Sequence, residues 1–238
     1  MIGSEGTLGV ITELTLKIIP APKEVISLVV LYENLEDCIA TVPKLMRSGF
    51  QPQALEFMER EIVRLSEAYL GKSTFPQQFE GTEINAYLLV TFDGDNEDQL
   101  ADVIEQASEI VLEAGALDVL VADTPQLKKD AWAARSSFLE AIEANTKLLD
   151  ESDVVVPVNQ IASYVTFIKD IANDYDFEVK SFSHDRHANL TTHNSSNHSA
   201  QEEVDLPVPD CTTRHYANAT DPGRQNLRPH CPRQGHCE

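Results

Sequence analysis

The first 182 residues alternate between two apolar patterns, one typical of strands and the other of helices. Strands are predicted from continuous or alternating apolar runs at residues 24–32, 51–58, 84–92 and 117–122. Helices are predicted from apolar residues at three- and four-residue spacing, from Leu35 to Met46, Glu59 to Leu70 and Leu100 to Ala114. The order strand, helix, strand, strand, helix, strand predicts an α+β fold, a ferredoxin-like antiparallel sheet with helices on one face. This fold occurs with many functions, so it assigns none.

A second group of elements is predicted after residue 122. Its members are a helix from Pro125 to about Thr146, a short strand at Val154–Pro157, a helix at Ile161–Asn173 and a strand at Phe177–Phe182. Thr124 followed by proline is typical of a helix start. The acidic residues Asp150, Glu151 and Asp153 precede the short strand. We expect a loop there rather than an active site with paired carboxylates, since nothing places two of them on one surface.

The opening segment, residues 1–22, combines regularly spaced glycines with a strand pattern. The glycines are Gly3, Gly6 and Gly9, and the alternating apolar residues are Leu14, Leu16 and Ile18. Glycine lets the backbone adopt positive φ or approach a ligand closely. The alternation predicts a half-buried strand over Val10–Ile19, ended by two prolines. A tight turn before an ordinary strand is the alternative interpretation, and the spacing is not that of the dinucleotide fingerprint.

Four stretches resemble a known family. They are Gly3–Lys17 (GSEGTLGVITELTLK), Ala54–Met58 (ALEFM), Ala131–Arg135 (AWAAR) and Asp153–Pro157 (DVVVP). In content and order they resemble the FAD-linked oxidases, a group that includes glycolate oxidase and D-lactate dehydrogenase subunits, over residues 1 to about 182. The resemblance implies a fragment, in which residues 1–22 end the FAD-binding domain and residues 23–182 form most of the C-terminal, substrate-covering domain.

The resemblance also implies which residues contact the cofactor and the substrate. Backbone groups along the FAD would come from Gly3, Ser4, Glu5, Gly6, Thr7, Gly9 and Val10. Arg135 would face the flavin and bind the substrate carboxylate, a task that suits the two parallel donors of a guanidinium. The alternative is an arginine on the helix surface that pairs with Glu140 or Asp130.

The character of the sequence changes after Ser183. All seven histidines lie beyond it, and helical and strand periodicity is absent. The family's next motif is Gly-His-x-Gly-Asp-Gly-Asn-x-His, of which this chain keeps only His184 and Asn189, with Thr191 in place of the second histidine. The resemblance makes His184 a remnant ligand of a divalent metal and Asn189 a substrate ligand. We expect residues 183–238 to be a disordered or out-of-frame tail.

Two other interpretations of this tail are weaker. Its soft metal ligands are Cys211, His215, His230, Cys231, His236 and Cys237, but their spacing matches no standard zinc module. Asn-x-Ser/Thr sequences begin at Asn189, Asn194, Asn197 and Asn218, and they bear on glycosylation only if the protein is secreted.

Composition narrows the choice of partners. The formal net charge of −21 argues against nucleic acid and against an anionic membrane surface. No apolar run is long enough for a membrane span, so a cytoplasmic protein is expected. Cys38, the lone cysteine of the first 182 residues, is most simply a small core residue.

Two classes of function follow. In the first, the chain is part of an FAD-dependent dehydrogenase of a 2-hydroxy acid such as D-lactate or glycolate, with electrons passing to an electron-transferring flavoprotein or another redox partner. In the second, the chain is an acidic ferredoxin-like module that binds another protein. A visible spectrum distinguishes them, because only the first predicts copurifying flavin. The isolated chain is expected to be inactive and to hold FAD weakly, since one wall of the site cannot enclose the dinucleotide.

Overall fold

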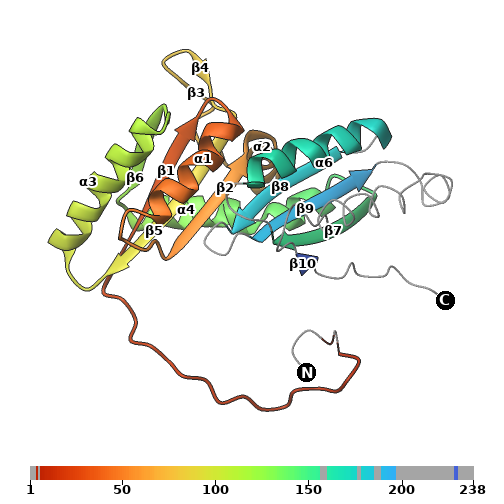
Figure 1. Ribbon diagram of the computed structural model, residues 1–238, viewed down its shortest axis with the longest axis horizontal. Coiled ribbons are helices and arrows are strands. Elements are labelled where there is room, and N and C mark those ends of the chain that lie inside the picture. Colours follow the sequence, from red (N-terminus) through yellow and green to blue (C-terminus); the bar gives the residue numbers. More distant parts are fainter. Residues whose placement is uncertain are drawn as a thin grey trace.

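An eight-stranded antiparallel sheet forms the centre of the molecule, with strand order β10-β7-β9-β8-β2-β5-β1-β6 (Figure 1). The computed structural model describes residues 4, 6–155, 160–175, 178–184, 189–196 and 228–229. The strands of the sheet are β1 (Glu24–Tyr32), β2 (Ala54–Glu59), β5 (Ala86–Gly94), β6 (Asp118–Ala122), β7 (Leu148–Val155), β8 (Glu178–His184), β9 (Asn189–Ser196) and β10 (Arg228–Pro229). A separate small hairpin consists of β3 (Gln78–Phe79) and β4 (Thr82–Glu83).

Six helices pack around this sheet in the described part of the chain. They are α1 (Leu35–Met46), α2 (Arg60–Leu70), α3 (Glu97–Glu113), α4 (Pro125–Ser136), α5 (Phe138–Glu143) and α6 (Ile161–Tyr175). Side chains cap three of them, since Asn34 Oδ1 accepts from the Asp37 N–H at 2.9 Å, Asn96 Oδ1 from the Asp98 N–H at 2.9 Å, and Thr124 Oγ1 from the Leu127 N–H at 3.2 Å. The helix predicted from Pro125 to Thr146 is interrupted at Ser137, where α4 ends and α5 begins.

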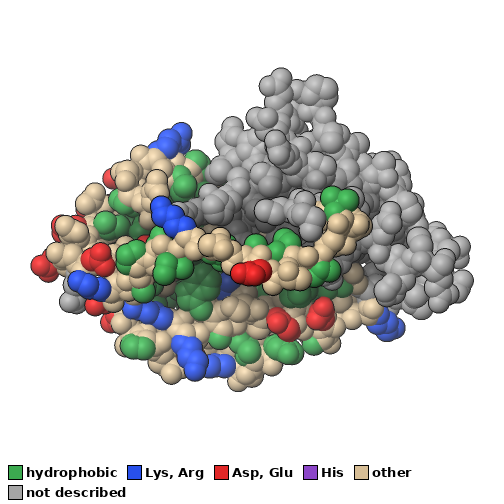
Figure 2. Space-filling view, turned by 90° about the horizontal axis from the view of Figure 1, so that it is seen from below, with side chains coloured by type: hydrophobic (Ala, Val, Ile, Leu, Met, Phe, Trp, Pro, Cys, Tyr) green, Lys and Arg blue, Asp and Glu red, His purple; other side chains and the backbone are tan. Residues whose placement is uncertain are grey.

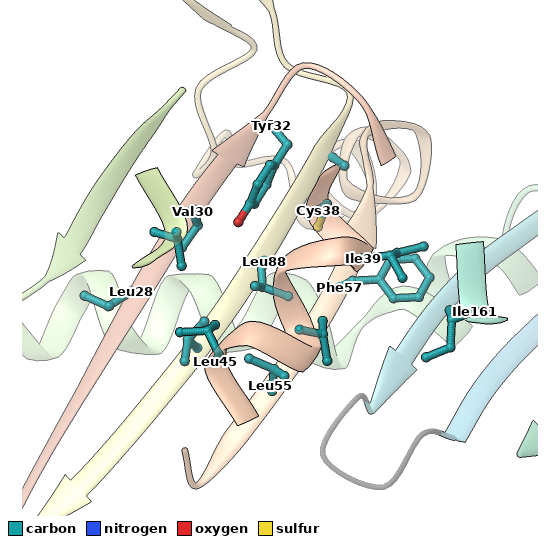
Figure 3. Packing of buried hydrophobic residues seen from close by; sticks show 14 of the residues in the cluster. Leu28, Val30, Tyr32, Cys38, Ile39, Leu45, Leu55, Phe57, Leu88 and Ile161 are labelled. Carbon is teal, nitrogen blue, oxygen red and sulfur yellow. The ribbon is translucent and has the colours of Figure 1, made fainter. Parts of the chain in front are cut away.

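The ferredoxin-like unit predicted from the sequence is confirmed. Its strands lie in the order β2-β5-β1-β6, and α1 and α3 provide the two crossovers. Both crossover helices pack on the same face, where their apolar residues meet those of the strands. Figure 3 shows Leu28, Val30, Leu55, Phe57 and Leu88 of the sheet in one buried cluster with Ile39 and Leu45 of α1.

The two helices of the ferredoxin-like unit cover one face of the sheet, as predicted, and α2, α4 and α5, which lie outside that unit, cover the other face. Leu55 and Phe57 of β2 belong to the core under α1, α3 and α6, whereas Met58 belongs to a second core under α2, α4 and α5. The same alternation occurs in β5, in which every residue from Ala86 to Phe92 is buried. A strand that is apolar on both sides has to be covered on both sides, or it would expose apolar surface to water.

Strands β8, β9, β7 and β10 extend the sheet beyond β2. The expectation that no strand follows residue 183 is wrong for residues 189–196, which form β9 between β7 and β8. The acidic residues Asp150, Glu151 and Asp153, expected in a loop, lie in β7. Main-chain hydrogen bonds to two neighbours can hold a polar strand that lacks an apolar period. The other residues of the predicted tail lie outside the described residues, apart from Ser183 and His184 at the end of β8 and from β10.

The strand predicted over Val10–Ile19 is absent from the structure, which describes residues 9–22 without secondary structure. Leu14, Leu16 and Ile18 are 67%, 74% and 88% exposed. The segment runs away from the body in Figure 1, and apolar side chains are spread along it in Figure 2, which views the molecule from that side. A strand requires a neighbour for its hydrogen bonds, and no described strand lies beside this one.

Candidate functional site

Arg135 lies in the last turn of α4 and points to the sheet rather than to solvent. The residue is 8% exposed. Its Nε and Nη2 both donate to Oε2 of Glu56 on β2, at 3.1 and 3.0 Å. The alternative pairing with Glu140 or Asp130 on the helix surface is therefore wrong, and Asp130 instead accepts from Lys72. Arg135 faces inward because it shares a side of α4 with Ala131 and Ala134, both buried.

Two aromatic rings enclose the guanidinium of Arg135. Its Cζ lies 4.5 Å from the ring centroid of Phe182 on β8 and 5.3 Å from that of Phe138 on α5. The two rings contact each other edge to face at 5.3 Å. His193 of β9, which is 1% exposed, stacks on Phe182 at 4.9 Å. The rings thus restrict the plane in which the guanidinium lies.

Two buried hydroxyls support the turn that carries Arg135. Ser66 Oγ of α2 donates to the Ala134 carbonyl at 2.7 Å and lies 2.9 Å from Ser137 Oγ. Ser137 Oγ also donates to the Ala134 carbonyl, at 3.1 Å. Because Ser137 stands at the break between α4 and α5, these bonds fix where the arginine-bearing helix ends against α2.

The strand register brings the other predicted site positions to the same place. Glu56 of β2 is the partner of His184 on β8, and His184 is the partner of Asn189 on β9. The three residues therefore form one row across neighbouring strands. The side chains of His184 and Asn189 lie outside the description, so their roles stay predictions.

Burial distinguishes Arg135 from every other cation whose side chain the structure describes. Among lysines and arginines with described side chains, Arg135 alone is buried. Burial of a cation is unfavourable unless an anion and hydrogen bonds compensate it, and Glu56, itself 4% exposed, supplies both. A planar donor held in a dry environment is suited to bind a second carboxylate.

The sequence did not single out Glu56, Phe182 or His193 as site residues. A signal for Glu56 was present, since it is a charged residue between Leu55 and Phe57 in a strand that is otherwise apolar. Phe182 has no such signal, because an apolar residue at the end of a strand is common.

The predicted flavin segment is open on the surface. Gly3 and Glu5 lie outside the described residues, and Thr7, Gly9 and Val10 are exposed. Gly6 has a φ of 79°, and the Thr7 N–H and Oγ1 both donate to the Ser4 carbonyl, at 2.9 and 2.6 Å. No atom lies within 4 Å of the place where a Cβ would stand at Gly6. The described residues therefore form a local turn there and do not by themselves enclose a flavin.

The described residues contain no group of three His, Cys, Asp or Glu that could hold a metal ion. The cysteines and histidines of the alternative zinc interpretation, and Asn197 and Asn218, lie outside the description. In the described part of the chain, no helix is both long enough and apolar enough to cross a membrane.

Known proteins resemble this chain in sequence and in structure. The chain is 61% identical over 223 residues to D-lactate dehydrogenase of Anaerostipes hadrus, which covers 94% of this chain and 47% of that protein. It is 33% identical over 192 residues to glycolate oxidase subunit GlcD of Bacillus subtilis (strain 168), covering 79% and 39%. The chain thus spans about half the length of the curated relatives it matches.

Two solved structures show the same fold at low sequence identity. An alkyldihydroxyacetonephosphate synthase has a TM-score of 0.66 at 14% identity, covering 91% of this chain and 43% of that one. A p-cresol methylhydroxylase with bound substrate has a TM-score of 0.63 at 12% identity, covering 86% and 45%.

The family match extends further than the sequence resemblance predicted. The profile described as FAD linked oxidases, C-terminal domain, matches residues 21–206, past the expected limit near Phe182. The match includes α4 with Arg135, strand β2 with Glu56, and all of β8 and β9. The chain belongs to the family of FAD linked oxidases, as their C-terminal domain.

Proposed function

We propose that this chain is the substrate-facing half of an FAD-dependent dehydrogenase of small 2-hydroxy acids, with D-lactate as the preferred substrate. Its similarity to a D-lactate dehydrogenase and to a glycolate oxidase subunit supports the substrate class, and the higher identity supports D-lactate. The observation that carries the proposal is the buried guanidinium of Arg135, held by Glu56 and two aromatic rings.

A 2-hydroxy acid presents a carboxylate beside the carbon that is oxidised. A guanidinium fixed in plane and orientation can bind both carboxylate oxygens and so determine where C2 and its hydrogen lie. This binding is the task that we assign to Arg135. Its charge also offsets, at close range, the repulsion between an anionic substrate and a chain of net charge −21.

The flavin would be held chiefly by the half of the relatives that this chain does not match, with the segment around Gly6 as one strip of the site. When bound, FAD would accept the hydride from C2. The hydroxyl proton requires a base, and we assign none among the described residues. Transfer of the electrons to a redox partner protein, and a cytoplasmic location, stay predictions from the resemblance.

A chimera tests the role of Arg135. In it, residues 21–182 of this chain replace the corresponding stretch of the Anaerostipes hadrus D-lactate dehydrogenase. Arg135→Lys keeps the charge but loses the paired donors, so the KM for D-lactate should rise roughly 10- to 150-fold, the equivalent of about 1.5 to 3 kcal/mol.

The matched control is Arg64→Lys, a substitution of an exposed arginine on α2, which should leave the KM unchanged. An Arg135→Lys chimera with the parent's KM would remove Arg135 from the substrate site. A parent chimera that oxidises glycolate more efficiently than D-lactate would contradict the proposed substrate preference.

A further inference from the structure

We propose that Glu56 is a positioning residue, which sets the orientation of Arg135 and thereby the preference for a substrate with a carboxylate. The proposal rests on the proposed function of Arg135. It assigns a role to Glu56, whose carboxylate accepts two hydrogen bonds from the Arg135 guanidinium.

Glu56 and the two aromatic rings restrict the guanidinium in different ways. Nε and Nη2 converge on a single oxygen, Oε2 of Glu56, at 3.1 and 3.0 Å. This arrangement uses the side edge of the guanidinium and opposes rotation about its long axis. The rings of Phe182 and Phe138 restrict the plane of the group. Together they determine the direction of the Nη1–Nη2 fork, the edge that a carboxylate binds in bidentate fashion.

Glu56 is placed on a rigid element. It lies in the middle of β2, with Leu89 of β5 as its partner on one side and His184 of β8 on the other. Leu55 and Phe57, its neighbours in sequence, are both fully buried in the opposite core. A strand fixed in this way holds its side chains more precisely than a loop does.

Both partners of the pair are buried, and burial strengthens the hydrogen bonds between them. The side chains of Arg135 and Glu56 are 9% and 5% exposed. Water therefore competes little for the donors of Arg135, and the orientation depends on the carboxylate. Without that carboxylate, the guanidinium would lose the two bonds at its side edge, and its fork would turn away from the direction that the substrate requires.

The same strand provides a matched control. Glu59 follows three residues later, is 9% exposed and pairs with Lys169 of α6 at 2.5 Å. Its pair lies in the opposite layer, under α6, whereas Glu56 contacts α4. Glu59→Gln removes a buried, ion-paired carboxylate from β2 just as Glu56→Gln does, without touching Arg135.

The experiment compares D-lactate with D-lactamide, its neutral amide, as substrates of the chimera. The readout is the ratio of the two kcat/KM values, because loss of stability or of active enzyme lowers both and leaves the ratio unchanged. Glu56→Gln should lower the preference for D-lactate at least five-fold, mainly through KM. Glu59→Gln should leave the ratio as in the parent. In an Arg135→Lys background, Glu56→Gln should lower the ratio by less than two-fold, since it acts through Arg135.

The outcomes separate the two proposals. If Arg135→Lys leaves the ratio unchanged, the proposed function of Arg135 is wrong. If Arg135→Lys lowers the ratio but Glu56→Gln does not, Glu56 is structural only and the positioning role is overturned. Should Glu56→Gln fail to fold, Glu56→Asp decides, since it keeps the charge and withdraws it by one methylene. A lowered ratio in that variant supports the role, and an unchanged ratio overturns it.

Discussion

The two faces of β2 each bury a carboxylate, but the cation that pairs with it is buried on one face and partly exposed on the other. On the face covered by α4 and α5, Glu56 pairs with Arg135, and the two side chains are 5% and 9% exposed. On the face covered by α6, Glu59 pairs with Lys169, whose side chain is 40% exposed. A lysine with its ammonium near water is an ordinary way to compensate a buried carboxylate.

The buried arginine is the unusual member of this comparison. Desolvating a cation as well as an anion is costly, and apolar residues of similar volume often give equal or greater stability. Stability alone therefore does not explain why Arg135 lies under the sheet. The binding role that we propose for Arg135 would explain it, and in this way the comparison between the two faces supports the proposed site on the α4 side.

Removing each cation in turn should give the largest difference in stability between the two faces. Arg135→Ala leaves Glu56 charged in a closed environment, so the free energy of unfolding should fall by about 3 to 5 kcal/mol. Lys169→Ala should cost less, since Glu59 can take up a proton and its partner was half exposed. Urea unfolding of the 238-residue chain, followed by circular dichroism, measures both. Equal losses in the two variants would mean that the faces do not differ.

The second prediction concerns the serine that supports the Arg135 turn. Ser66→Ala removes a buried donor to the Ala134 carbonyl and leaves Ser137 with one partner fewer. The free energy of unfolding should fall by about 1 to 3 kcal/mol. The same urea experiment measures this loss, with Ser163→Ala on the exposed side of α6 as the control. A Ser66→Ala chain as stable as the parent would show that the turn is held by packing alone.

The smallest predicted effect lies on the α6 face and depends on pH. Burial raises the pKa of Glu59, and the nearby charge of Lys169 opposes this shift. A carboxyl with a higher pKa in the folded chain stabilises the fold at low pH, and this contribution is lost as the pH rises through the folded value. Glu59→Gln should therefore gain stability relative to the parent as the pH rises from 4 to 8. Parallel stability curves for the two chains would contradict this sign.

Local sequence determined most of the elements of this protein. The periods of β1, β2, β5 and β6, the caps at Asn34 and Thr124, and the ferredoxin-like order of strands and helices all depend on neighbouring residues. The family could also be recognised from short motifs, among them ALEFM, which contains Glu56, and AWAAR, which contains Arg135.

Tertiary structure alone decided how these elements meet. Arg135 and Glu56 are 79 residues apart in the sequence, and nothing local favours Glu56 as its partner over Asp130 on the same helix or Glu140 on α5. The polar strand β9 is stabilised by main-chain hydrogen bonds to β7 and β8. Because such bonds do not depend on the side chains, the sequence of β9 has no apolar period. The segment Val10–Ile19 has the period but no neighbouring strand in the described chain. A period records which side of an element is apolar, whereas a strand or an ion pair exists only where the fold supplies the partner.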